Sequence, residues 1–263
     1  MSFKLLEDVF KESNVLVPYL TLGDHSLDFT KKMINAFICE GADIIELGIP
    51  FSDPIADGPT IQESHQRALG NRPDIGLDDA FNLVSEFSQL TNVPFVFMSA
   101  VNLIYNFGIE RFFKSAKDVG LGGVIIPDLA VEDANEYIRF SKVYGVNLIF
   151  LVSPLCRQDR LESIVKSSSG FVYLISSVGI TGERVSFSDN LDALVKKIKS
   201  IKDISVVVGF GISEPEQFKL VNSFADGAII GSHFVKIINK YLPDEEKVVQ
   251  EVVKRVKLFK TEA

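Results

Sequence analysis

The sequence predicts an α/β protein with a (β/α)8 TIM barrel, formed by one domain over residues 1–263. Eight short apolar runs alternate with helical patterns from the beginning of the chain to its end, as parallel strands joined by helical crossovers require. The runs are apolar throughout rather than alternating, which is typical of strands covered on both faces. The length of 263 residues also matches the roughly 250 residues of a typical barrel.

Each element follows from a local pattern. Short β-branched and aromatic runs bounded by Gly, Pro or Asp mark strands, and apolar residues spaced three and four apart mark helices. We expect strands at residues 15–20, 43–47, 94–98, 123–126, 147–152, 171–175, 204–208 and 227–230. We expect the helices that follow them around residues 29–37, 77–87, 112–116, 134–141, 161–165, 191–198, 218–221 and from 244 onward.

Three further helices are expected in addition to the regular alternation of one strand and one helix. A short amphipathic helix around residues 3–10 precedes the first strand. Pro59 begins an extra helix that reaches Leu69, because proline suits the first helical turn, and another, residues 232–241, follows the eighth strand. An open doubly wound sheet is the alternative fold, but eight evenly spaced strands and the lack of G-x-G-x-x-G after the first favour a closed barrel.

Composition and charge exclude several classes of function. The formal net charge is −8, and basic residues stand out only near residues 254–260, so nucleic acid and anionic membranes are not expected partners. The chain has no run of ~20 apolar residues for a membrane span. Its start, M-S-F-K-L-L-E-D-V-F, carries acids where a signal peptide needs an apolar core. We therefore expect a cytoplasmic protein.

The cysteines and histidines show no spacing typical of a metal site. Cys39 and Cys156 form no C-x-x-C pattern, and we expect both in the core. His25, His65 and His233 lie near different strand ends, where surface or supporting roles are expected. The sequence therefore predicts no metal.

The stretch D-I-I-E-L-G-I-P-F-S-D-P-I-A-D-G-P, residues 43–59, carries the most distinctive chemistry. Glu46 lies inside an apolar strand, where Glu is depleted and rarely buried without a partner. Asp53 and Asp57 follow in the next loop. A buried carboxylate and a second acid within one loop can hold different protonation states and perform different proton transfers. The structural alternative is that Glu46 bonds to backbone and both aspartates form turns.

Glycines at three consecutive strand ends predict a phosphate site. They occur in Thr181-Gly182 after the sixth strand, Gly209–Ser213 after the seventh, and Gly231-Ser232 after the eighth. Glycine lets backbone N–H groups approach an anion, and the extra helix presents its positive end. The long segment after the sixth strand suggests a mobile lid. Carboxylates with a phosphate site indicate acid–base cleavage or isomerisation of a phosphorylated small molecule.

The stretch E-L-G-I-P-F-S-D-P-I-A-D-G-P resembles the signature of the tryptophan synthase alpha chain family. P-Y-L-T-L-G-D, V-I-I-P-D-L, V-G-I-T-G, V-G-F-G-I-S and G-S-x-x-V-K-I-I extend the likeness over nearly the whole chain. The resemblance implies a carbon–carbon lyase of tryptophan biosynthesis that splits indole-3-glycerol phosphate into indole and D-glyceraldehyde 3-phosphate. It also implies an alpha2-beta2 heterotetramer in which the beta chain receives the indole and alone carries pyridoxal phosphate.

The resemblance also implies roles for individual residues. Glu46 would move protons between the glycerol hydroxyl and indole C3, and Asp57 would hold the indole N–H. Asp53 and Pro54 would meet the beta chain. The substrate-binding residues implied by position are Tyr173, Thr181, Gly182, Phe210, Gly211, Gly231 and Ser232.

Several positions depart from the family pattern. Ser177 stands where Arg is usual, and Ala100 and Val101 replace a Tyr-rich stretch. His25 and Ala130 stand where Pro is common. The substitutions in the lid motivate one alternative, an activator of a beta chain with weak or no lyase activity. A second alternative, another phosphate-binding barrel enzyme such as an isomerase, fits the carboxylates and the glycines almost as well and is disfavoured only by the motif.

Overall fold

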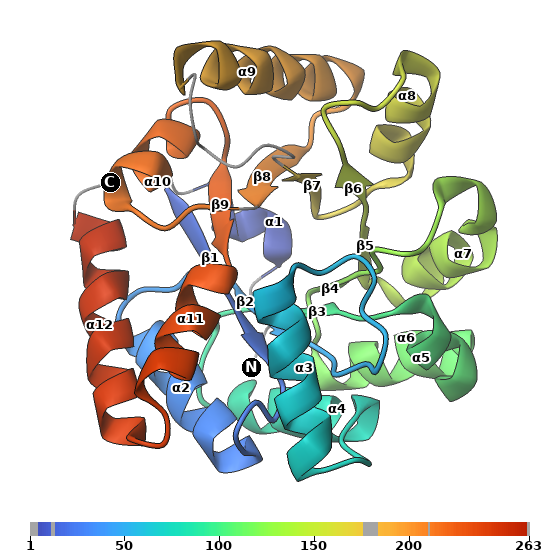
Figure 1. Ribbon diagram of the computed structural model, residues 1–263. Coiled ribbons are helices and arrows are strands. Elements are labelled where there is room, and N and C mark those ends of the chain that lie inside the picture. The colour runs from blue at the N-terminus through green and yellow to red at the C-terminus, as the bar shows by residue number, and fades with distance from the viewer. Residues whose placement is uncertain (1–4, 12–13, 176–183, 210, 262–263) are drawn as a thin grey trace.

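A parallel sheet closes on itself, and most of the helices surround it (Figure 1). The computed structural model describes residues 5–11, 14–175, 184–209 and 211–261. The strands are β1 (Val15–Thr21), β2 (Ile45–Gly48), β3 (Phe95–Met98), β4 (Gly123–Ile125), β5 (Asn147–Ile149), β6 (Leu151–Val152), β7 (Phe171–Ile175), β8 (Ser205–Gly209) and β9 (Gly227–Ile230).

The strand order shows how the barrel closes. It runs β5-β4-β3-β2-β1-β9-β8-β7-β6, and every pair is parallel. The two end strands, β5 and β6, are halves of the one predicted strand 147–152, interrupted at Phe150. The Phe150 carbonyl accepts a hydrogen bond from Tyr173 N–H at 3.0 Å, which joins the halves to β7. The predicted (β/α)8 barrel is therefore confirmed.

The helices also follow the predicted order. Those described are α1 (Leu6–Val9), α2 (Leu27–Cys39), α3 (Pro59–Asn71), α4 (Leu77–Phe87), α5 (Val101–Phe107), α6 (Ile109–Val119), the 3-10 turn η1 (Val131–Asp133), α7 (Asn135–Tyr144), α8 (Gln158–Ser167), α9 (Arg184–Ile201), α10 (Pro215–Asn222), α11 (Ser232–Tyr241) and α12 (Glu245–Thr261). The extra helices expected before the first strand and after the second and eighth are α1, α3 and α11. None of the described helices is long and apolar enough to cross a membrane.

Helix α5 was not predicted. Ile104 is its one fully buried side chain, so its sequence carries little helical periodicity. The cap comes from elsewhere in the chain, because Val101 N–H donates to the Asp128 carboxylate at 2.8 Å. Asp128 follows β4, 27 residues further along, and no local pattern reveals such a cap.

Alternate residues of the strands form two apolar layers. Val15, Val17 and Ile44 belong to the barrel interior, where α1 contributes Leu6 and Val9 and closes one end. Side chains of the opposite parity, together with the buried faces of the outer helices, form a second and larger core. Burial on both faces explains why the strands are apolar throughout.

The prediction that both cysteines lie in the core is wrong. Cys39 is exposed at the end of α2, and Cys156 is partly buried before α8. Cys39 lies two residues beyond the buried Phe37, so it points about 200° around the helix from that residue. Cys39 therefore lies on the side of the helix away from the buried face and is exposed.

Candidate active site

A cavity of about 270 Å³ opens at the carboxyl ends of the strands. This is the end at which barrel enzymes bind their substrates. The lining residues come from β1, β2, β3, β7 and β9 and from the segments after β2, β8 and β9. They are Tyr19, Glu46, Asp57, Gly58, Pro59, Thr60, Ile61, Met98, Tyr173, Gly211, Ile229, Gly231, Ser232 and Lys236.

Most of the predicted site residues meet in this cavity. Glu46, Asp57 and Tyr173 line it together with the predicted phosphate-binding residues Gly211, Gly231 and Ser232. Thr181, Gly182, Phe210 and the departure Ser177 lie outside the described residues. The strand alternation explains the position of Glu46, because Ile45 and Leu47 point into the outer core while Glu46 between them points into the cavity.

Glu46 is a buried acid with no protein partner in the described part of the chain. The side chain is fully buried, and neither carboxylate oxygen accepts or donates a hydrogen bond there. Burial raises the pKa of Glu46 to about 8, with a smaller contribution from the negative charge of Asp57. A buried carboxylate without partners is costly to fold, so its retention points to use in chemistry.

Asp57 has a different environment in the same cavity. Its carboxylate is about one-fifth exposed, and burial raises its pKa to about 6. Its backbone carbonyl accepts a hydrogen bond from Gln62 Nε2 at 2.8 Å. At pH 7 Asp57 is therefore mostly ionised, whereas Glu46 is mostly protonated. Two acids with separated pKa values can take the roles of charged stabiliser and proton donor.

Two tyrosines shape the wall beside these acids, and each depends on a glycine of the next strand. A Cβ at Gly48 would lie 2.2 Å from the Tyr19 hydroxyl oxygen, and one at Gly209 would lie 2.3 Å from that of Tyr173. Both tyrosines are buried. Glycine at these two strand ends therefore leaves room for a phenol ring inside the barrel.

Another group of lining residues suits an anion. Gly231 precedes α11, and Ser232 is its first residue, so the free N–H groups of the first helical turn lie at these residues. Gly211 has φ +81°, a left-handed conformation that favours glycine. Among the described residues other than its chain neighbours, none has an atom within 4 Å of a Cβ built there. Lys236, one turn into α11, adds a positive charge at the rim.

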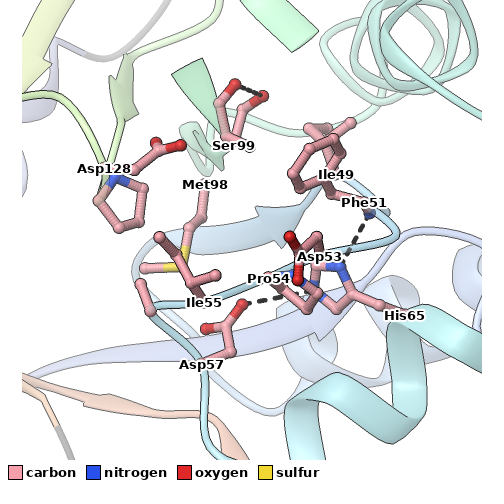
Figure 2. Close-up of a pocket in the computed structure, with 13 residues that line it drawn as sticks. Ile49, Phe51, Asp53, Pro54, Ile55, Asp57, His65, Met98, Ser99 and Asp128 are labelled. Atoms are coloured by element: carbon pink, nitrogen blue, oxygen red, sulfur yellow. Dashed lines mark hydrogen bonds and ion pairs between the residues drawn. The ribbon is translucent and has the colours of Figure 1, made fainter. Parts of the chain in front are cut away.

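A second pocket lies beside the cavity and holds the predicted partner-binding residues. Figure 2 shows Asp53, Pro54 and Ile55 around it, with Asp57 and His65 on the same side. Asp57 and Met98 line both spaces, so the two are adjacent. Ala100 lines the second pocket, where the family usually has a Tyr-rich stretch.

Two of the other departures act on the backbone in opposite ways. His25 has φ +74°, which the proline ring excludes, so this turn differs from one built on proline. Ala130 has φ −71°, close to the value that proline fixes. The change at Ala130 therefore leaves the turn after β4 compatible with the family's proline.

Sequence reasoning missed three residues of the site. Tyr19 and Lys236 line the cavity, and His65 is buried behind Asp57, with its Nε2 atom 3.7 Å from Asp57 Oδ2. Tyr19 shares the strand alternation of Val15 and Val17, which was the available signal. His65 repeats the helical spacing of the buried Ile61, but that pattern does not reveal its partners.

Comparison with known proteins gives one consistent family. Residues 6–263 match the family model of the tryptophan synthase alpha chain. The tryptophan synthase alpha chain of Lacticaseibacillus casei is 38% identical over 258 residues, which is 98% of this chain and 96% of the relative. That of Methanocaldococcus jannaschii is 41% identical over 244 residues, 92% of this chain and 85% of the relative.

Solved structures agree with these relatives. Tryptophan synthase subunit alpha from Legionella pneumophila superposes with a TM-score of 0.88 at 29% identity, covering 99% of this chain and 98% of the other. A chain from the tryptophan synthase a2b2 complex of Pyrococcus furiosus gives 0.85 at 38% identity, covering 94% and 98%. The chain therefore belongs to the tryptophan synthase alpha chain family and functions as a lyase in tryptophan biosynthesis.

Proposed function

We propose that the chain cleaves indole-3-glycerol phosphate to indole and D-glyceraldehyde 3-phosphate by a retro-aldol reaction. The observation that carries this proposal is the unpartnered, fully buried Glu46 carboxyl in one cavity with Asp57 and the N-terminus of α11. The phosphate binds at Gly211, Gly231 and Ser232, and this places the indole ring toward the two acids.

Glu46 carries out both proton transfers. Protonated at neutral pH, it gives its proton to indole C3, and the ring becomes a cationic indolenine. The resulting Glu46 carboxylate then takes the proton of the glycerol hydroxyl next to the ring. The bond between C3 and the carbon that bears this hydroxyl then breaks. Its electron pair returns to the ring, and the hydroxyl oxygen becomes the carbonyl oxygen of the aldehyde. Glu46 ends protonated, as it began.

Asp57 stabilises the intermediate. Positive charge develops at the indole nitrogen when C3 gains a proton, and an ionised carboxylate that accepts the N–H offsets it. Tyr173 packs beside the ring. Thr181, Gly182 and Phe210 complete the substrate site in this proposal, as the family resemblance implies.

We also propose that the loop carrying Asp53 and Pro54 binds a tryptophan synthase beta chain in an alpha2-beta2 assembly, as in the Pyrococcus furiosus relative. An exposed apolar side chain in this loop supports a partner, because Ile55 is 76% exposed. Pyridoxal phosphate belongs to that partner, and this chain uses no cofactor. A single cytoplasmic domain without nucleic-acid or membrane contacts completes the proposal.

Indole release from indole-3-glycerol phosphate tests both parts. We expect measurable release by the chain alone and faster release when a beta chain is added. Asp53→Lys should weaken binding of the beta chain in a titration and leave release by the isolated chain unchanged. Release in neither case, with a faster beta reaction on mixing, would instead identify a non-catalytic activator.

A further inference from the structure

Helix α3 holds the loop that carries Asp57, and its buried histidine lies between the loop and the barrel. We propose that His65 is a positioning residue for the cleavage reaction. It fixes the loop that carries Asp57, through Phe51, and the Tyr19 hydroxyl, as part of a series of hydrogen bonds that all run in one direction. The role in catalysis rests on the proposed function, whereas the hydrogen-bond chain can be tested separately.

The first hydrogen bond of this series determines which ring nitrogen of His65 carries the proton. Phe51 N–H donates to His65 Nδ1 at 3.0 Å, so Nδ1 is an acceptor and carries no proton. The ring is neutral, because burial lowers its pKa to about 4. The single ring proton is therefore on Nε2. Nε2 lies 3.2 Å from the Tyr19 hydroxyl oxygen and 3.7 Å from Asp57 Oδ2.

The last hydrogen bond of the series determines the directions of the hydroxyl hydrogen bonds before it. Ser64 Oγ donates to the Ile61 carbonyl at 2.6 Å. Its only proton is used there, so it accepts from the Thr21 hydroxyl, also at 2.6 Å. Thr21 in turn accepts from the Tyr19 hydroxyl at 3.0 Å, and Tyr19 accepts from His65 Nε2. A backbone donor at one end and a backbone acceptor at the other allow this one order.

The residues joined by these hydrogen bonds are buried. Tyr19, Thr21, Ser64 and His65 are each at most 4% exposed. Breaking one of the hydrogen bonds leaves a buried polar group unpaired, which is costly. These hydrogen bonds therefore hold β1, α3 and the acidic loop in one fixed arrangement.

Helix α3 also provides the described hydrogen bonds that join the acidic loop, residues 50–57, to other elements. Among the described hydrogen bonds of residues 50–57, those to other elements are Phe51 N–H to His65 and Gln62 Nε2 to the Asp57 carbonyl. Figure 2 shows the first of these hydrogen bonds and the approach of His65 to Asp57. Gln62 and His65 are three residues apart, on one side of the helix. Removing the imidazole therefore frees the loop at the residue that precedes its two acids.

Nitrogen NMR of the wild-type protein with labelled histidine tests the hydrogen-bond chain. His65→Gln identifies the signal of this residue among the three histidines. We expect a neutral ring at pH 7 with the proton on Nε2 and a bare Nδ1. A proton on Nδ1, or a doubly protonated ring at pH 7, would overturn the assignment. Neither result depends on enzymatic activity.

Kinetics of cleavage test the role in catalysis. His65→Leu removes both bonds, and we expect kcat to fall about 100-fold, the usual effect of a misplaced catalytic group, with KM changed much less. His65→Gln places an amide donor near the Nε2 position and should recover about tenfold of that loss. Gln66→Leu is the matched control, because Gln66 is exposed on the next position of α3; it should leave kcat unchanged.

The outcomes separate the two proposals. A folded His65→Leu variant with kcat within about twofold of wild type would overturn the positioning role. If only its melting temperature fell, or if His65→Gln recovered nothing, the histidine would be a purely structural residue. A wild-type chain that releases no indole would overturn the proposed function and the catalytic role with it, while the NMR result would still decide the hydrogen-bond chain.

Discussion

Replacing Glu46 by Gln should remove catalysis and stabilise the fold at the same time. Gln has the shape of the protonated acid but cannot transfer a proton. General acid–base catalysis is worth roughly 100-fold or more, so kcat should fall by at least that factor, about 2.7 kcal/mol in activation free energy. The KM for the phosphorylated substrate should change little, because Glu46 is not among the residues proposed to bind the phosphate.

The gain in stability follows from the raised pKa of Glu46. A free carboxyl has a pKa of 4.5, and in the folded chain burial raises it to about 8. Between these values the folded chain keeps a proton that the unfolded chain releases, so the free energy of unfolding decreases as pH rises and levels off above pH 8. The cost is about 3 kcal/mol at pH 7 and about 5 kcal/mol above pH 8. A glutamine amide does not titrate in this range, so Glu46→Gln removes the cost.

Urea unfolding at pH 4.5 and pH 8, together with indole release at pH 7, measures both effects. We expect wild type and Glu46→Gln to have similar stability at pH 4.5 and to diverge at pH 8, with the variant more stable. An unchanged kcat would exclude Glu46 from the reaction. A stability difference that did not vary with pH would show that its carboxyl is not held protonated by burial.

Three other changes test the rest of the cavity. Asp57→Asn should lower kcat roughly 10- to 100-fold with a native circular dichroism spectrum, and an unfolded variant would instead make Asp57 structural. Gly209→Ala places a Cβ 2.3 Å from the Tyr173 hydroxyl and should lower kcat/KM about tenfold. Gly70→Ala is the control and should not lower it, because no other described segment has an atom within 4 Å of a Cβ at Gly70. Equal effects of the two substitutions would refute the packing argument. Ser232→Asp puts a negative charge at the start of α11 and should raise KM at least about tenfold, while an unchanged KM would place the phosphate elsewhere.

Local sequence patterns were sufficient to predict most of the strands and helices. The strands 171–175 and 227–230 and the helices 77–87 and 232–241 have their predicted bounds, because each is a continuous periodic run with Gly or Pro nearby. The second strand begins at Ile45 rather than Asp43. At Asp43 both the side chain and the backbone contact β1: the carboxylate accepts a hydrogen bond from Leu16 N–H at 2.7 Å, and the Asp43 N–H donates to the Leu16 carbonyl at 3.0 Å.

The site was predictable where its chemistry breaks a local rule. Glu46 in an apolar strand and glycines at consecutive strand ends are exceptions that the sequence displays. Tyr19 and His65 break no such rule, because an aromatic residue in a strand and a residue on the buried face of a helix are ordinary. Their roles come from contacts between segments far apart in the chain, such as the 46-residue separation of Tyr19 and His65.

The central claim is that one cavity holds the indole ring at the two acids and the phosphate at α11. A crystal structure of Glu46→Gln with bound indole-3-glycerol phosphate tests it most directly, because the inactive variant retains the substrate. We predict the phosphate against Gly231 and Ser232, the indole nitrogen within hydrogen-bond distance of Asp57, and C3 next to the substituted side chain. A substrate bound with its ring away from Asp57, or with its phosphate away from α11, would contradict the account.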